Sequence, residues 1–340
     1  MKRYLASLFI FIFPSFSLGD VRITHFDFSD LLGWSSDNHD LALDVFKETC
    51  PDLKAPDWSS LCAIAQNTDA SREFFEIFFK PVHISTGDAA LFTGYFEPEI
   101  NGSRIKTDQF SYPVYSMPPE LRQGQTWLTR KEIETSSTLR ERGLEIAWVD
   151  DLADLFFLQI QGSGRIKLDD GGVLRIGYAG SNSRPFKSVA EEFIRLGILE
   201  KHQASAKMIK NWVRKNPQAG SEILWHNESY VFFRVVEKLA SDKGPVGAMN
   251  RSLTALRSLA VDPDYVPLGA PVWINKKGTP PMRRLMIAQD TGSVIKGSQR
   301  ADIFLGSGDI AGDKASQIKD GGSLFVLLPF KRAMLLSSHE

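Results

Sequence analysis

The segment AQDTGSVIKGSQRADIFLGSGD, residues 288–309, decides how this sequence is interpreted. It contains an apolar stretch ending at Asp290, a glycine-containing turn, and a second apolar stretch in which Asp302 lies between Ala301 and Ile303. Short apolar runs separated by turns predict β-strands. A carboxyl group inside such a strand is desolvated, and desolvation raises its pKa because it disfavours the charged form. A general acid needs a carboxyl group of this kind, so Asp302 and Asp290 are candidates for acid–base chemistry.

Aspartates near turns often hold the turn through backbone hydrogen bonds and have no chemical role. Asp309 and Asp313, in a glycine-rich stretch, fit this structural interpretation better than a catalytic one. Gly306, Gly308 and Gly312 have a spacing one residue longer than the dinucleotide-binding pattern, and we expect a strand rather than a helix after them. A nucleotide or nicotinamide cofactor is therefore not expected.

The rest of the chain is predicted to alternate between helical and β-rich regions. Residues 40–80 are expected to be helical, with Asp69 capping a phenylalanine-rich helix that packs into the core. Residues 145–180 are expected to form β-hairpins, and helices are expected after Ser188 and over about 204–215. Five later strands are predicted, at 230–236, 271–275, 284–288, 301–305 and 323–328.

Composition narrows the function classes. The chain has 340 residues, 43% hydrophobic and 24% charged, so we expect roughly two folded domains and no disordered chain. A net charge of −1 gives no reason to expect nucleic acid as a partner. The six histidines lack metal-ligand spacing, and two cysteines are too few for a thiolate metal site, so no metal is expected.

Residues 1–19 have the order of a secretory signal peptide. Lys2 and Arg3 precede an apolar run over residues 5–13, and the small residues Ser17 and Gly19 precede the expected cut. A buried N-terminal strand is the alternative. No cysteine follows the apolar run, so a lipoprotein anchor is not expected. We expect an exported, periplasmic protein that could associate with the outer membrane.

Export changes how Cys50 and Cys62 are interpreted. In an oxidising compartment, two cysteines twelve residues apart favour a disulfide over a catalytic thiol. Two buried free thiols remain the alternative.

Several separated motifs, in order along the chain, resemble the membrane-bound lytic murein transglycosylase A family. The segment that contains Asp290 and Asp302 resembles the three-aspartate domain of that family. The other matching motifs span about residues 90–329: LFTGYFEP at 91–98, FLQIQGSG at 157–164, GYAGSN at 177–182, NESYVFF at 227–233, GPVGA at 244–248, SLAVD at 258–262 and PLG at 267–269.

The resemblance implies a mainly β fold, with a double-psi β-barrel domain, a smaller inserted β-rich domain and a few helices. On this basis residues 20–90 and 239–335 contribute the two parts of the barrel domain. Residues 91–238 form the inserted domain. The family binds a peptidoglycan strand between the two domains.

The family cleaves the β-1,4 bond between N-acetylmuramic acid and N-acetylglucosamine without water, leaving a 1,6-anhydro end. The resemblance assigns the catalytic position to Asp302, with Asp290 ordering the strand or tuning that acid. For substrate contacts we expect hydroxyl, amide and aromatic side chains on the matching motifs: Thr93, Tyr95, Gln161, Ser163, Tyr178 and Asn182.

The expected enzyme is a lytic transglycosylase, exo-acting or endo-acting, with no cofactor. A monomer is expected to suffice, and partners in a cell-wall synthesis or hydrolysis complex are compatible with the activity. The main alternative is a non-catalytic peptidoglycan-binding protein that uses the same barrel. A hydrolase that leaves reducing ends is a third possibility, which the lack of a confident second catalytic carboxylate disfavours.

Overall fold

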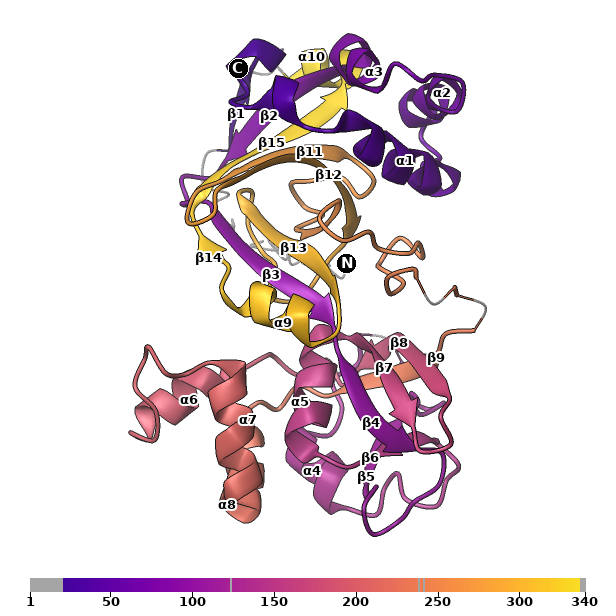
Figure 1. Ribbon diagram of the computed structural model, residues 1–340, viewed down its shortest axis with the longest axis vertical. Coiled ribbons are helices and arrows are strands. Elements are labelled where there is room, and N and C mark those ends of the chain that lie inside the picture. Colours follow the sequence, from indigo (N-terminus) through magenta and orange to yellow (C-terminus); the bar gives the residue numbers. More distant parts are fainter. Residues whose placement is uncertain (1–20, 123, 238, 241, 337–340) are drawn as a thin grey trace, which may run out of the picture.

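A computed structural model describes residues 21–122, 124–237, 239–240 and 242–336. The expected signal peptide, residues 1–19, lies outside the described residues. The described chain is mainly β, with two sheets and several helices (Figure 1). No helix of this part of the chain combines the length and apolar character needed to cross a membrane.

The larger sheet combines both ends of the described chain. Its strand order is β1-β2-β15-β11-β12-β10-β13-β3-β14. Most neighbours are antiparallel, but β10 with β12 and β13 with β3 are parallel. The strands are β1 Arg22–His25, β2 Phe79–Ser85, β3 Leu91–Glu97, β10 Ser258–Val261, β11 Pro271–Lys276, β12 Met282–Asp290, β13 Arg300–Ser307, β14 Lys319–Asp320 and β15 Gly322–Pro329.

Helices from both ends of the chain lie beside this sheet (Figure 1): α1 His39–Thr49, α2 Pro56–Ala65, α3 Ser71–Phe78 and α10 Phe330–Leu336, with 3₁₀ helices Phe28–Asp30, Trp34–Ser36 and Cys50–Asp52. Phe74 and Phe75 of α3 and Phe79 of β2 are buried in the largest hydrophobic core, as predicted. The expected cap is wrong, because the N-cap of α3 is Ala70 and Asp69 makes no capping bond there.

A disulfide joins Cys50, in the turn after α1, to Cys62 of α2, with 5.5 Å between the Cα atoms. The bridge closes a loop of helix and turn that packs on the core through Leu53, Trp58 and Leu61. It therefore connects two helices at the edge of the largest core and constrains the unfolded chain.

The smaller sheet has the order β5-β6-β4-β7-β8-β9. Its strands are β4 Glu99–Ser103, β5 Tyr112–Tyr115, β6 Glu145–Val149, β7 Ser163–Leu168, β8 Val173–Ser181 and β9 Val231–Val235. The helix α4, Arg130–Thr135, begins with a capping box between Thr129 and Glu132. β7 and β8 form the hairpin predicted around residues 169–172.

The β-hairpin predicted between β6 and β7 is wrong, because Leu152–Gln161 forms the helix α5. Asp151 caps its first turn by accepting a hydrogen bond from the N–H of Asp154, and Gly162 ends it with a φ of +77°. Leu155 and Leu158 pack into the core of the smaller sheet, whereas Ala153 and Phe156 of the same helix pack into a separate apolar cluster.

Three further helices form a small apolar cluster with α5: α6 Val189–Arg195, α7 Ala206–Lys215 and α8 Pro217–Leu224. Ser188 caps α6 and Gly197 follows its end with a φ of +69°, as the sequence predicts. Another helix, α9 Asp309–Ser316, follows Gly308 directly. The expectation of a strand after these glycines is therefore wrong.

The chain passes between the sheets twice. β3 in the larger sheet continues through Pro98 into β4 of the smaller one, and residues 236–257 return from β9 to β10. β3 therefore belongs to the larger sheet by its hydrogen bonds, although residue 91 is the expected start of the inserted domain. The later strands agree with the predictions, and β10 is an additional short strand.

Candidate active site

The two aspartates flank one residue of a central strand. β10 lies between β12 and β13, and its Ala260 is in register with Asp290 on one side and Asp302 on the other. Residues in register on neighbouring strands share a face of the sheet. A carboxyl group therefore lies on either side of a small, buried alanine.

Asp302 is held by the next strand along the sheet. Thr93 of β3 is in register with Asp302, and its hydroxyl donates to Oδ1 of Asp302 over 2.5 Å. Arg300 Nη2 donates to the same hydroxyl oxygen over 2.8 Å. Burial raises the pKa of Asp302, although the Thr93 hydrogen bond and the Arg300 charge oppose this rise. A carboxyl group that keeps its proton can donate it to a substrate.

Asp290 has a different set of partners. Its Oδ2 accepts from the Tyr95 hydroxyl over 2.9 Å, and its Oδ1 accepts from the N–H of Ala248 over 2.9 Å. Burial, with a smaller contribution from the nearby Asp302, raises the pKa of Asp290 to about 6. Burial and the two carboxylates also raise the pKa of Tyr95 well above its ordinary value, so Tyr95 stays a hydrogen-bond donor.

The smaller sheet meets β3 close to these residues. Gln161, at the end of α5, accepts a hydrogen bond on Oε1 from the N–H of Phe96. Ser163 begins β7 and is in register with Gly177 of β8. The next residue of β8, Tyr178, is 47% exposed. The two sheets thus come together at Thr93, Tyr95 and Gln161, and the neighbouring β7–β8 hairpin carries Ser163 and Tyr178.

Asn182 does not lie on a surface that a substrate can reach. It is fully buried, and its amide donates to the carbonyls of Leu128 and Glu228, each over 2.8 Å. Its Oδ1 accepts from the N–H of Tyr230 over 2.8 Å. The predicted substrate contact is therefore corrected: Asn182 connects three segments of the smaller domain and has no hydrogen-bonding capacity left for a sugar.

Two contributors to the site were not predicted. Arg300 lies two residues before Asp302, and the period of two along a strand places both on one face, so this signal was available. The N–H of Ala248 comes from the returning segment 236–257, and no sequence pattern connects it with Asp290.

Close packing around β3 positions the site. α9 lies against this strand at Gly94, where an added Cβ would be 2.9 Å from the Cα of Ala315. The ring of Tyr95 packs against Phe304 of β13, with 5.3 Å between ring centroids. These contacts restrict how the side chains of Thr93 and Tyr95 can move.

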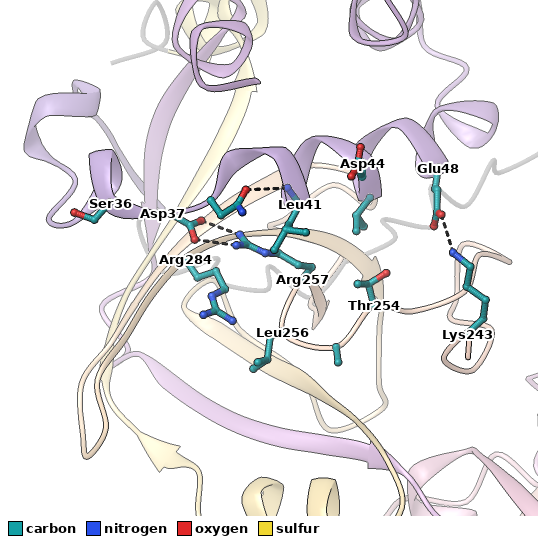
Figure 2. Close-up of a pocket in the computed structure, with 13 residues that line it drawn as sticks. Ser36, Asp37, Leu41, Asp44, Glu48, Lys243, Thr254, Leu256, Arg257 and Arg284 are labelled. Carbon is teal, nitrogen blue, oxygen red and sulfur yellow. Dashed lines mark hydrogen bonds and ion pairs between the residues drawn. The ribbon is translucent and has the colours of Figure 1, made fainter. Parts of the chain in front are cut away.

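A separate cavity of about 670 Å³ lies between α1 and residues 254–257 (Figure 2). In its lining, Arg257 and Asp37 form a largely buried ion pair with two hydrogen bonds of 2.8 and 2.9 Å. Arg284 also lines it, and burial lowers the pKa of its guanidinium. None of the predicted site residues lines this cavity.

Within the described residues, no group of histidine, cysteine and acidic side chains is arranged to hold a metal ion.

Comparison with known proteins places this arrangement among solved structures and curated sequences. Residues 91–234 match a family model described as the MltA specific insert domain, and residues 257–328 match the 3D domain. A membrane-bound lytic murein transglycosylase A of Vibrio cholerae is 34% identical over 248 residues, or 70% of this chain. The match spans 65% of the length of that relative.

Two solved structures extend the match to nearly the whole chain. LtgG, a lytic transglycosylase of Burkholderia pseudomallei, is 39% identical with a TM-score of 0.62, covering 91% of this chain and 96% of that one. A membrane-bound lytic murein transglycosylase from Agrobacterium tumefaciens is 30% identical with a TM-score of 0.83, covering 92% of this chain and 99% of that one.

Proposed function

Because the chain belongs to the membrane-bound lytic murein transglycosylase A family, we propose that it is a lytic transglycosylase, a carbon–oxygen lyase acting on peptidoglycan. The bond cleaved is the β-1,4 linkage from N-acetylmuramic acid to N-acetylglucosamine. The observation that carries this proposal is Asp302, a strand-borne carboxyl with a raised pKa, held by Thr93 where the two sheets meet.

In the first step, the carboxyl proton of Asp302 passes to the glycosidic oxygen. The C1–O bond breaks, N-acetylglucosamine leaves with its 4-hydroxyl restored, and positive charge develops at C1 and the ring oxygen of the muramic residue. The raised pKa of Asp302 supports this role because it keeps the group protonated to higher pH than an ordinary aspartate.

In the second step, the C6 hydroxyl of the same muramic residue bonds to C1 and closes the 1,6-anhydro ring. Its proton passes to the Asp302 carboxylate, which restores the acid. The nucleophile belongs to the substrate and is already close to C1, so one enzyme carboxyl is enough. Ordinary glycosidases need two because water or an enzyme group attacks.

Asp290 supports this chemistry without transferring a proton. Tyr95 and the N–H of Ala248 occupy both of its oxygens, so it orders the strands around Ala260. When it is ionised, its charge disfavours ionisation of Asp302 and favours the developing positive charge at C1. We propose that five side chains contact the glycan strand: Thr93, Tyr95, Gln161, Ser163 and Tyr178.

The finer architecture and location are also proposals. A double-psi β-barrel in the larger sheet is supported by its two parallel pairs, β10 with β12 and β3 with β13, which join distant parts of the chain. An inserted domain carries the smaller sheet. Export to the periplasm is supported by the disulfide between Cys50 and Cys62, a bond typical of oxidising compartments.

The test uses residues 20–340, purified sacculi and mass spectrometry of the soluble muropeptides. We expect products one water lighter than hydrolysis products. Asp302→Asn should reduce their release by about 10²- to 10⁴-fold, as expected for loss of a general acid. Asp309→Asn, the same change at an exposed position of α9, should leave release unchanged. Hydrated reducing ends, or full activity of Asp302→Asn, would contradict the proposal.

A further inference from the structure

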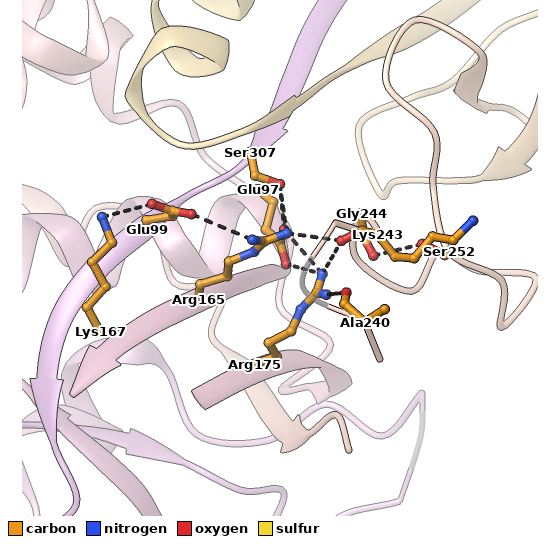
Figure 3. A network of polar contacts seen from close by, with 10 residues as sticks. All are labelled: Glu97, Glu99, Arg165, Lys167, Arg175, Ala240, Lys243, Gly244, Ser252 and Ser307. Atoms are coloured by element: carbon orange, nitrogen blue, oxygen red, sulfur yellow. Dashed lines mark hydrogen bonds and ion pairs between the residues drawn. The ribbon is translucent and has the colours of Figure 1, made fainter. Parts of the chain in front are cut away.

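Glu97 is a buried carboxylate at the point where the chain leaves the larger sheet. It ends β3, the strand of Thr93 and Tyr95, and directly precedes Pro98. Only 1% of Glu97 is exposed. Its side chain accepts from Arg165 Nε over 2.8 Å, from Arg175 Nη2 over 3.0 Å and from the Ser307 hydroxyl over 2.6 Å (Figure 3).

The partners of Glu97 come from both sheets. Arg165 of β7 and Arg175 of β8 are in register with each other in the smaller sheet. Ser307 ends β13, the strand of Asp302, and is in register with Glu97 in the larger sheet. One carboxylate therefore connects the ends of the two site-bearing strands to the β7–β8 hairpin, which carries Ser163 and Tyr178.

The returning segment 236–257 meets the same network. Arg165 Nη2 and Arg175 Nη2 donate to the carbonyl of Lys243 over 3.0 and 2.9 Å, and Arg175 Nη1 donates to the carbonyl of Ala240 over 2.9 Å. Arg175 Nη2 thus serves Glu97 and Lys243 at once. Both passages of the chain between the sheets are held at a single point (Figure 3).

The energetics favour one arrangement of this network. A buried charge is costly unless hydrogen bonds and opposite charge compensate it, so Glu97 and the two guanidinium groups stabilise each other only in the correct geometry. Rotating one sheet against the other would separate Glu97 from Arg165 and Arg175 and leave buried charges without partners. The nearby pair of Lys167 with Glu99 is different, because Lys167 is 56% exposed.

We infer that Glu97 is a positioning residue that fixes the orientation of the smaller sheet relative to the larger one. It thereby sets the distance between the residues on β3 and β13 and the proposed glycan contacts on α5, β7 and β8. The orientation itself does not depend on the activity. The consequence for substrate binding rests on the proposed function.

Pulsed electron paramagnetic resonance tests the orientation directly. Spin labels at Ile77→Cys, on α3, and Ile105→Cys, after β4, report the distance between the two parts, since both positions are exposed and the native cysteines are bridged. We expect one narrow distance distribution for the parent and for Lys167→Ala. Glu97→Gln should broaden or shift it. An unchanged distribution in folded Glu97→Gln would overturn the inference.

Kinetics test the consequence for the substrate. For Glu97→Gln we expect the KM for sacculi to rise about tenfold, with kcat and its pH profile close to the parent, because Asp302 keeps its own contacts. An unchanged KM would refute this consequence. An inactive parent would refute the proposed function and leave the distance measurement decisive for orientation.

A milder variant keeps the inference testable if Glu97→Gln does not fold. Ser307→Ala removes one hydrogen bond to Glu97 and a longer one, of 3.4 Å, from Arg165 Nη2, but leaves both guanidinium groups paired with the carboxylate. It should broaden the distance distribution less than loss of the carboxylate would, but measurably more than Lys167→Ala does. A distribution equal to that of Lys167→Ala would count against Glu97.

Discussion

Arg300 and Asp302 contact the same hydroxyl group. Thr93 Oγ1 accepts from Arg300 Nη2 over 2.8 Å and donates its own hydrogen to Asp302 Oδ1 over 2.5 Å. The cation therefore acts on the acid through an oriented hydroxyl as well as through its charge. This relay limits how far burial raises the pKa of Asp302.

Thr93→Val should move the alkaline limb of the pH–rate profile to higher pH. The Thr93 hydroxyl lowers the pKa of Asp302 by donating to its charged form, so its loss raises that pKa. Activity requires protonated Asp302, and the acid then stays protonated to higher pH. The measurement is kcat/KM on soluble muropeptides as a function of pH. Thr93→Ser keeps the hydroxyl and should keep the profile, and a shift toward lower pH in the valine variant would contradict the relay.

Asp290 should make stability depend on pH. Its pKa of about 6 in the folded protein exceeds the ordinary value of 3.8, so the folded state binds this proton more tightly than the unfolded state. The associated stabilisation, about 3 kcal/mol, is complete below about pH 4 and is lost as the pH rises through 6. Urea unfolding between pH 4 and 7 should show a flatter dependence for Asp290→Asn. Equal slopes for both proteins would disprove the assignment.

Alanine substitutions of Asn182 and Tyr178 should have different effects: the first should lower the unfolding free energy, and the second should raise the KM. Asn182→Ala removes a fully buried amide and leaves the Tyr230 N–H without its acceptor, so we expect a loss of about 3 kcal/mol in unfolding free energy with little change in KM. Tyr178→Ala, at a half-exposed position, should cost at most about 1 kcal/mol and raise the KM for sacculi. Denaturant unfolding and steady-state kinetics on both variants decide this, and the reverse pattern would restore Asn182 as a contact.

The disulfide should contribute measurably to stability. A bridge between residues 12 apart restricts the unfolded chain by about 3 kcal/mol in the chain-entropy treatment. The double variant Cys50→Ser/Cys62→Ser should lose about that much in unfolding free energy and keep its activity, since the bridge joins the turn after α1 to α2 and does not contact Asp302. The reduced parent should behave in the same way, and an unchanged midpoint would show that the bridge adds nothing.

Strand positions were predictable where short apolar runs end at turns. The strands β11, β12, β13 and β15 match their predicted ranges within a few residues. α5 was missed because LADLFFLQIQ is apolar on most of its circumference. A helix that is buried on several sides shows no polar face to reveal its period.

The site was only partly predictable, for reasons of distance along the chain. Asp302 and Asp290 stand out because a carboxyl in an apolar strand is locally unusual. The function of Asn182 depends on Leu128 and Glu228, 54 and 46 residues away, and nothing local distinguishes a structural amide from a binding one. Glu97 was equally inconspicuous, because its arginine partners lie 68 and 78 residues further along.

The two segments that connect the sheets meet at Glu97, and this affects how the part of the chain between them can be removed. The residues that enter and leave the smaller sheet share a donor nitrogen, so the two ends of the inserted segment are neighbours. A segment with adjacent ends can be gained or deleted as a unit, because a short linker then suffices to reconnect its host. A short linker between Glu97 and Lys243 is therefore expected to reconnect the larger sheet, which keeps Asp290 and Asp302, when the segment between them is removed.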